Sequence, residues 1–190
     1  MTKDYFEDEL FEGKNYTTEH FLKADYENCR FTNCVFTKTV LANIVFADCI
    51  FDRCDLSMAE LRNTTFRDVQ FKHCKLLGLR FDECNSFLLS FSFEDCVLNF
   101  SSFYKQKLKT TNFINCKLAE TEFAEADLTN AVFSNCDLQK AVFNRTILEN
   151  ADFRTSVNFS IHPETNKISK AKFSLHNVTG LLDQYNISIE

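Results

Sequence analysis

A five-residue repeat is the sequence feature that most limits how this chain can fold. Between residues 112 and 153, Phe or Leu recurs at every fifth position, and a small side chain or Cys stands two residues before each. A period of five fits neither the ~3.6-residue turn of an α-helix nor the two-residue alternation of a strand. We interpret it as an internal repeat whose units bury their large side chains by stacking. The large positions are Phe113, Leu118, Phe123, Leu128, Phe133, Leu138, Phe143, Leu148 and Phe153.

Stepping through the chain by 20 residues, the length of four five-residue units, brings the same residue types back. The step lengthens to 22 between Cys74 and Cys96, which places two extra residues at 85–89. We expect a small jog there, with Leu88 as the first large centre position after it. Each coil then adds one Phe to a centre column and one Cys to a small column beside it. The centre column is Phe31, Phe51, Phe71, Phe93, Phe113, Phe133 and Phe153, and the small column is Cys34, Cys54, Cys74, Cys96, Cys116 and Cys136.

Eight of the nine cysteines fall two residues before a centre position of the repeat, and the ninth, Cys84, stands two residues before Ser86 at the start of the expected jog. Free cysteine behaves as a small hydrophobic side chain, so we interpret these residues as part of the core. The sequence contains no Cys-x-x-Cys pair and no repeating His at ligand spacing, which argues against a metal site. It also lacks a recognisable Ser, His and acid arrangement and a Gly-rich phosphate loop. We therefore expect no catalysis, no metal and no cofactor.

The chain begins with MTKDYFEDEL, which is acidic and lacks the basic and then apolar segments of a secretion signal. No apolar run reaches the ~18–20 residues of a membrane span, so we expect a cytoplasmic protein that does not contact membranes. One basic cluster contains Lys105, Lys107 and Lys109, and two of these lysines have acidic partners one coil away. For this reason we expect no direct binding to nucleic acid.

The repeat units resemble those of a known family. They read ADLTN, AVFSN, CDLQK, AVFNR, TILEN and ADFRT, which is similar to the consensus of the pentapeptide-repeat proteins. The resemblance implies an all-β fold, a right-handed, four-sided β-helix with 20 residues in each coil and a short C-terminal helix and strand as a cap. We expect an N-terminal cap over residues 1–23, the β-helix over 24–155, and a last coil with an excursion and a capping or dimerisation segment over 156–190.

The two ends of the chain depart from the pattern in different ways. Phe6, Phe11 and Tyr16 keep the spacing of five, but charged residues stand two before them, so we assign a separate cap and leave strand or helix open. Near the other end, Phe173 follows Phe153 by 20 residues and predicts one more coil. The apolar tail is too short to be stable alone and resembles the ending of the Qnr quinolone-resistance proteins, which implies a two-fold dimer. The expected dimer contacts are Leu181, Leu182, Tyr185, Ile187 and Ile189.

The formal net charge is −6, and half of it lies in residues 1–24, where three Lys face six Asp and Glu. Stepping by 20, or by 22 across the jog, aligns many other acids with bases, as in Lys72 with Glu94, Glu60 with Arg80, and Glu125 with Arg145. Such pairs across a sheet stabilise it and fix its register. The acids that this rule leaves without an opposite charge form a candidate acidic face: Asp48, Asp68, Asp95, Glu122, Glu149 and Asp152.

The resemblance to the Qnr proteins implies a function. It implies binding to the bacterial type II topoisomerases, DNA gyrase and topoisomerase IV, by a rod that imitates duplex DNA and so relieves quinolone inhibition. A negative field on such a rod would repel real DNA. The chain departs from the better-known Qnr proteins in having no long loops between its coils. The alternative is a structural or interaction scaffold for an unrelated protein partner, using the jog or a dimer groove.

Overall fold

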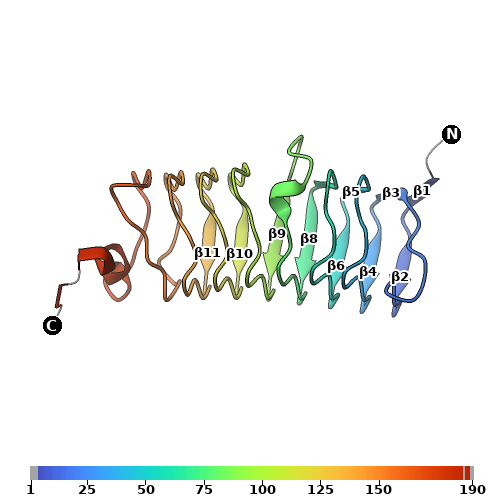
Figure 1. Ribbon diagram of the computed structural model, residues 1–190, viewed down its shortest axis with the longest axis horizontal. Helices are drawn as coiled ribbons and strands as arrows, with labels where there is room; N and C mark the ends of the chain where they lie inside the picture. The colour runs from blue at the N-terminus through green and yellow to red at the C-terminus, as the bar shows by residue number, and fades with distance from the viewer. Residues whose placement is uncertain (1–3, 186, 189–190) are drawn as a thin grey trace.

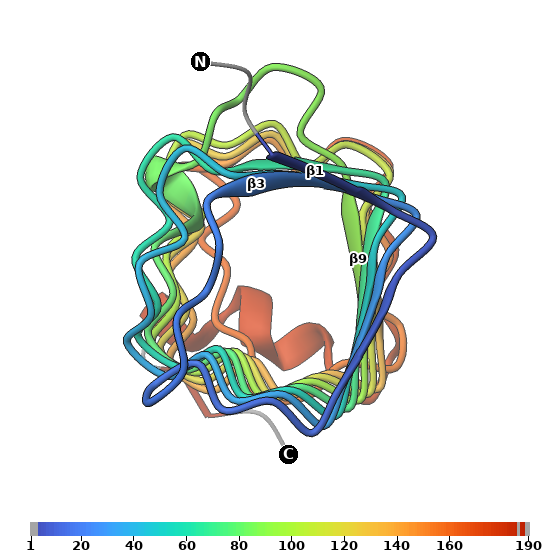
Figure 2. The same cartoon turned by 90° about the vertical axis from the view of Figure 1, so that its right-hand side faces the viewer.

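The computed structural model describes residues 4–185 and 187–188, and it is a straight rod with the two ends of the chain at opposite ends (Figure 1). Seen along the rod, the coils lie over one another and enclose a four-sided interior (Figure 2). Successive coils pair in parallel with a step of 20 residues, as in Phe31 with Phe51 and Phe113 with Phe133. The fold class predicted from the repeat is confirmed.

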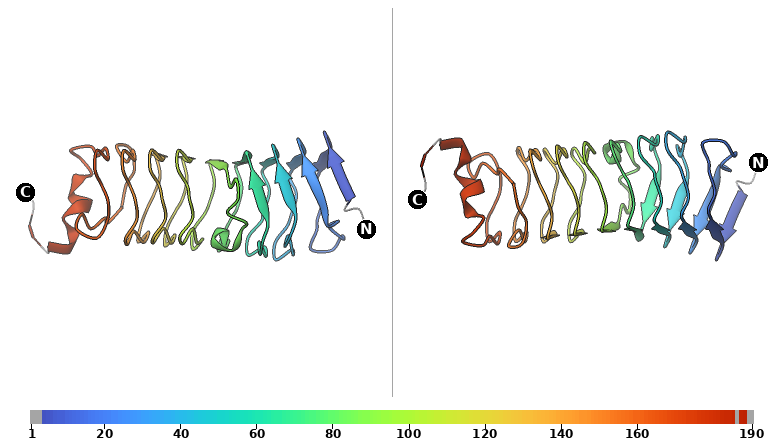
Figure 3. Two further views of the ribbon diagram at one scale, coloured as in Figure 1. Left: turned by 90° about the horizontal axis from the view of Figure 1, so that it is seen from above. Right: turned by 90° about the horizontal axis from the view of Figure 1, so that it is seen from below.

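One face of the rod carries a parallel sheet through most of its length, in the order β11-β10-β9-β8-β6-β4-β2. A second face carries a sheet in the N-terminal half alone, in the order β1-β3-β5-β7 (Figure 3). The first sheet contains β2 (Leu10–Glu12), β4 (Arg30–Thr32), β6 (Ile50–Asp52), β8 (Val69–Lys72), β9 (Phe91–Glu94), β10 (Asn112–Ile114) and β11 (Val132–Ser134), and the second contains β1 (Asp4–Glu7), β3 (Ala24–Glu27), β5 (Val45–Ala47) and β7 (Thr65–Arg67).

The jog follows the short 3-10 helix η1 (Phe81–Glu83) and projects from the rod as a small loop (Figure 1). The pairing of Phe71 with Phe93 confirms the 22-residue step. The expectation that Leu88 is a centre position is wrong, because its side chain is 58% exposed. The inserted residues bulge outward, and Phe91 turns inward instead, with its ring 6.4 Å from that of Phe66.

The centre column is a continuous stack of Phe rings along the rod. Neighbouring rings, from Phe31 to Phe153, lie 4.7–5.4 Å apart between centroids and within 18° of parallel, the step across the jog included. Phe173 continues the stack 5.5 Å beyond Phe153, which confirms the additional coil. All seven rings of the predicted column are at most 1% exposed.

The small positions hold side chains that donate a hydrogen bond to the coil before. The thiol of Cys54 donates to the carbonyl of Phe31 and that of Cys136 to the carbonyl of Phe113, each over 3.3 Å. The hydroxyl of Thr121 occupies an equivalent place and donates to the carbonyl of Leu98. Cys, Ser and Thr suit these positions because the site is narrow and offers an acceptor, whereas Ala fits by its size alone. All nine cysteines are free and buried, and burial raises the pKa of the Cys49 thiol to about 12.

The corners of the coils use left-handed backbone two residues after each centre position. Asn33, Asn115 and Asn135 stand there with φ between 53° and 55°. Asn tolerates this conformation better than most residues, which explains how a chain with 3 Gly turns so many corners. The Asn side chains also pair along the rod, since Asn135 donates to Asn115 over 3.2 Å.

Residues 4–23 form a coil in register with the rest, rather than a separate cap. Asp4 pairs with Ala24 in β1–β3 and Phe11 with Phe31 in β2–β4, so of the two alternatives left open, strand is the one observed. The charged residues that argued for a cap are exposed at the open end of the rod and do not enter the core. They are Asp4, Glu9, Lys14 and Glu19.

The opposite end is covered by two short 3-10 helices, η2 (Val178–Leu181) and η3 (Asp183–Tyr185), which lie across it (Figures 2 and 3). Leu181 packs against the core, and Gly180 is buried. The expected strand is absent at 187–188, and Ile189 lies outside the described residues. Within the ranges that the structure describes, no helix has the length and apolar character needed to cross a membrane.

Candidate functional site

The acids predicted to form one face do not lie together. Asp48 and Asp68 occupy the same corner one coil apart, as the pairing of Ala47 with Arg67 places them. Asp95 stands at the next corner, where it accepts a hydrogen bond from Asn115. Glu122 lies on another face and accepts from the backbone of Ala124. Outside the pair at one corner, the set does not form a surface.

The expectation that Asp152 lacks an opposite charge is wrong. Its carboxylate lies 2.7 Å from the guanidinium of Arg154 in the same coil, and the residue pairs with Lys172 in the next coil. The hydrogen bond from Arg154 lowers the pKa of Asp152. Residues two apart on an extended segment point to the same side, so a base within the coil is as close as one in the next coil.

The predicted charge ladder is confirmed at two of its steps and replaced at others, such as Asp127, which forms its ion pair with Lys109 and not with Lys107. Lys72 lies 3.6 Å from Glu94 across the jog, and Arg145 forms an ion pair with Glu125. Arg80 does not reach Glu60 and binds Asp82 of its own coil over 2.6 Å instead. In the upper half of the rod, Lys109 with Asp127 and Arg154 with Asp152 form further ion pairs.

A different set of acids does lie together, along the corner that joins the two sheets in the N-terminal half. We call it the N-terminal corner ridge, and its residues are Glu7, Asp8, Glu27, Asp48 and Asp68. The backbone places them in a row. The N–H of Asp8 donates to the carbonyl of Glu27, and the N–H of Asp48 to that of Arg67.

Four of the five ridge carboxylates are exposed, and Glu27 is half-buried with Arg67 at 3.7 Å. The hydrogen bond from Tyr5 to Glu27, together with the negative charges around it, raises the pKa of Tyr5 to about 12. Sequence reasoning missed Glu7 and Asp8 because residues 1–23 were set aside as a cap. Continuing the 20-residue step from Asp68 through Asp48 and residue 28 to Asp8 would have found the row.

A second polar cluster surrounds Asp52, whose side chain is 7% exposed. Its carboxylate receives Arg30 at 3.2 Å, Arg53 at 3.0 Å and the Nδ1 atom of His73 at 3.1 Å. The other ring nitrogen of His73 lies 3.5 Å from Asp95 in the next coil. Burial acts to raise the pKa of Asp52, but the hydrogen bonds from His73 and Arg30 outweigh it, and the pKa is lowered. The cluster ties four successive coils together, with Arg30 in the first, Asp52 and Arg53 in the second, His73 in the third and Asp95 in the fourth.

We expect Asp52→Asn to lower the free energy of unfolding by about 1–2 kcal/mol at neutral pH, since hydrogen bonds to a charged group are lost. The folded-state pKa of Asp52 is below its unfolded value of about 3.9, so its stabilisation is complete above that value and disappears as pH falls through the folded pKa. The difference between variant and parent should therefore shrink in acid. Urea unfolding at a series of pH values measures it. A difference that stays constant, or one matched by exposed Asp48→Asn, would contradict this role.

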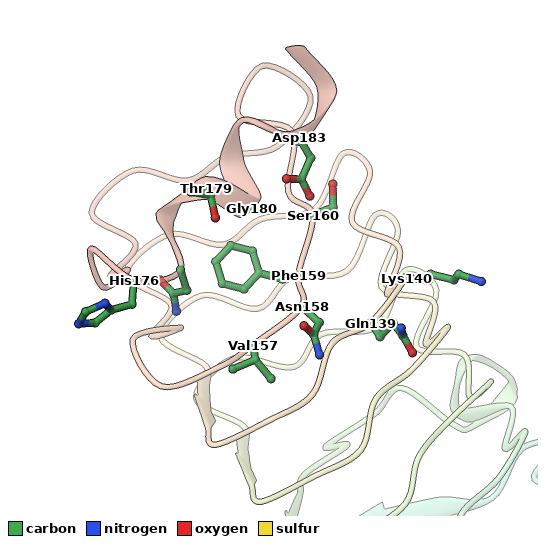
Figure 4. A pocket seen from close by; sticks show the side chains of 11 residues that line it. Gln139, Lys140, Val157, Asn158, Phe159, Ser160, His176, Thr179, Gly180 and Asp183 are labelled. Atoms are coloured by element: carbon green, nitrogen blue, oxygen red, sulfur yellow. The ribbon is translucent and has the colours of Figure 1, made fainter. Parts of the chain in front are cut away.

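The C-terminal end carries an open hollow of about 600 Å³ between the last coils and η2–η3 (Figure 4). The ring of Phe159 lies at its centre beside Gly180, while His176 and Lys140 point away from it. Among the expected dimer contacts, Leu181 and Leu182 are half-buried, and Tyr185 and Ile187 are 48% and 57% exposed. Of the expected dimer contacts, Leu181 and Leu182 therefore help to cover the end of the rod, whereas Tyr185 and Ile187 face solvent.

Among the described residues, no group of three or more His, Cys, Asp and Glu side chains is arranged to hold a metal ion. The acids that show a lowered pKa, such as Asp82 and Asp127, owe it to hydrogen bonds that outweigh burial, and each lies beside a Lys or Arg. Paired carboxylates of this kind serve structure. What the described residues do present is the row of exposed acids on the N-terminal corner ridge.

Comparison with known proteins agrees with the architecture. The family model described as a pentapeptide repeat region matches residues 24–103, 88–162 and 106–178, which together span 24–178. No curated protein sequence matches the chain. Two solved structures of trypsin-treated variants of QnrB1, described as a plasmid-mediated fluoroquinolone resistance protein, are similar to it. One has a TM-score of 0.71 and 17% identity over 100% of this chain and 95% of that chain, and the other 0.64 and 18% over 98% and 100%.

Proposed function

The chain belongs to the pentapeptide-repeat family, and we propose that it is a cytoplasmic, non-enzymatic binding protein that occupies the DNA site of DNA gyrase or topoisomerase IV and protects the enzyme from quinolones. The observation that carries this proposal is the N-terminal corner ridge. Its corner positions recur once per coil, ~4.8 Å apart, on the outside of a straight rod. A row of negative charges on a rod is what a basic DNA-binding groove is built to attract.

The fold and the net charge are two independent observations that support topoisomerase binding. The fold is that of QnrB1, whose description as a fluoroquinolone resistance protein names the same class of activity. The net charge of −6 would steer the rod toward a positively charged groove and away from DNA itself. Because exposed charges are screened by salt, the interaction should weaken as ionic strength rises.

Neutralising the ridge should weaken the effect on the enzyme. We expect Asp48→Asn with Asp68→Asn to raise the concentration needed for half-maximal inhibition of gyrase supercoiling at least ~10-fold, which corresponds to about 1.4 kcal/mol. Asn keeps the left-handed backbone at both corners, as it does at Asn130 and Asn150. The assay titrates purified protein into supercoiling reactions with and without ciprofloxacin.

The matched control for the single variant Asp48→Asn is Glu120→Asn, which also removes one exposed acid with left-handed backbone, at a different corner. It removes charge without touching the ridge and should leave inhibition unchanged. Equal effects of the two variants would assign inhibition to net charge alone. Absence of both inhibition and protection by the parent protein at micromolar concentration would refute the proposal.

We also propose that two copies associate about a two-fold axis through the C-terminal ends. Leu175, Tyr185 and Ile187 are 91%, 48% and 57% exposed on or beside the segment that covers this end. Large apolar side chains exposed near one end of a rod favour association through that end. Such a dimer would place the two ridges in the distant halves of a longer rod.

One observation favours a different function, that of a scaffold for an unrelated protein. The jog loop exposes Phe87 and Leu88 by 71% and 58%, and no coil geometry requires large apolar side chains there. A partner with an apolar cleft would bind this loop without using the acidic ridge. Repeated recovery of gyrase subunits in a pull-down from host lysate would exclude this alternative.

A further inference from the structure

We infer that the N-terminal end of the rod is a docking site for a basic, extended segment of another protein, which adds as a strand to the outer edges of β1 and β2. The site consists of two edge strands, the aromatic side chains behind them and an acidic rim. It lies at the end of the rod, whereas Asp48 and Asp68 lie on its side. The inference does not depend on binding to a topoisomerase.

The two strands at this end are the terminal strands of their sheets. The later coils show which backbone groups face outward. At the position of Leu10, the N–H of Arg30 donates to the carbonyl of Glu9, and the N–H of Ile50 to that of Cys29, each in the preceding coil. The N–H of Leu10 therefore points out of the end of the rod. Edge groups of this kind are templates for pairing with another chain.

The next side of the first coil is closed by its own residues. The N–H of Asn15 donates to the side chain of Glu19 over 3.3 Å, and its carbonyl accepts the N–H groups of Thr18 and Glu19. The backbone groups of Asn15 are thus satisfied within the coil. This leaves the edges of β1 and β2, which are adjacent, as the place where an added strand can pair.

Behind these edges lies an apolar hollow of about 150 Å³. Phe6, Phe11 and Tyr16 line it and are only partly buried, whereas Leu10, next to Phe11 on the strand, points to the outer face and is 61% exposed. At the other end of the rod, Leu181 packs over the corresponding place. An incoming strand that points alternate apolar side chains inward would cover the rings in the same way.

The rim selects the charge of the occupant. Asp4, Glu7, Glu9 and Glu12 are all exposed around this end, and Lys14 is the base beside Glu19, at 3.9 Å. A second copy would bring the same negative rim, so repulsion opposes pairing between two N-terminal ends. A segment that alternates basic and apolar residues satisfies the rim, the hollow and the strand edge together.

The test uses a synthetic peptide of about eight residues that alternates lysine and valine, long enough for one strand. We expect it to bind the full chain, and Leu10→Pro to weaken its binding at least tenfold. Proline removes the outward N–H but is tolerated at a strand edge where that group faces solvent. Leu10→Val keeps the N–H and should bind like the parent, with thermal unfolding showing that both variants fold.

A second peptide with N-methylated backbone amides on one edge separates strand pairing from charge. It keeps every side chain and should lose binding to the parent protein. A peptide in which glutamate replaces lysine should also fail. Equal binding of the methylated peptide, equal binding of the acidic peptide, or absence of binding by the basic peptide at millimolar concentration would each overturn the inference. Peptide binding and gyrase inhibition by the Asp48 and Asp68 variants are separate measurements, so the failure of one leaves the other proposal standing.

Discussion

Replacing Phe113 by Ala is expected to lower the free energy of unfolding by about 3–5 kcal/mol. The ring is fully buried and stacked between Phe93 at 5.2 Å and Phe133 at 4.8 Å. Phe103 and Phe123 close it in edge-on at 6.0 and 5.9 Å. The backbone hydrogen bonds between coils hold the neighbouring rings in place, so they cannot move in to fill the volume that the Phe113 ring leaves. The cavity therefore keeps almost its full volume and adds its full cost to the loss of hydrophobic burial.

The control is Ile114→Ala on the same strand. This side chain points outward and is 37% exposed, so its loss should cost less than ~1 kcal/mol. Asn115 is a poorer control, because its φ of 54° and its hydrogen bond to Asp95 would add their own cost. Urea unfolding followed by circular dichroism compares the midpoints. Similar destabilisation by the two Ala variants would contradict the inward and outward assignment.

The coil and its columns could be predicted from the sequence because neighbours in a solenoid lie a constant number of residues apart. Phe31 and Phe51 touch for the same reason as Phe113 and Phe133. Counting by 20, and by 22 at one place, therefore locates contacts without any knowledge of the backbone path. The rule holds for buried side chains, whose volume the repeat restricts.

Counting by 20 residues fails where a side chain has several neighbours that it could contact equally well. Leu88 lies in the inserted region and Phe91 begins the strand after it, and counting does not decide which of these two large side chains turns inward. Asp152 takes Arg154, two residues away, although Lys172 is its partner in the ladder. A long charged side chain can reach a partner in its own coil or in the next coil. Because exposed ion pairs contribute little free energy, small differences decide which of the two partners it takes.

The candidate site was predictable in part for the same reason. The row of Asp48 and Asp68 follows from the 20-residue step, and Glu7 and Asp8 were missed when residues 1–23 were excluded from the count. The partner is a different matter. The repeat restricts the buried positions, which must fill the core, but it leaves the charged positions on the surface free to vary. It therefore predicts the fold and does not predict the binding partner.

Gly180→Ala is expected to destabilise the C-terminal end by about 3 kcal/mol, the upper part of the range for overpacking. A Cβ atom there would lie 2.3 Å from the carbonyl oxygen of Phe159 and 2.7 Å from its ring. The carbonyl of Gly180 also accepts the N–H of Ile161 over 2.9 Å, so the segment cannot move away without losing that bond. Hydrogen exchange should increase in η2 and η3, while the centre of the rod stays protected.

The same variant tests the proposed dimer. If two copies associate through η2 and η3, sedimentation should show a shift from dimer toward monomer in Gly180→Ala. Gly13→Ala is the matched change at the other end, where φ is 62° and no atom lies within 4 Å of the added Cβ. It should cost about 1 kcal/mol through backbone strain alone and leave association unchanged. A dimer that survives displacement of the C-terminal segment would place the two-fold contact elsewhere on the rod.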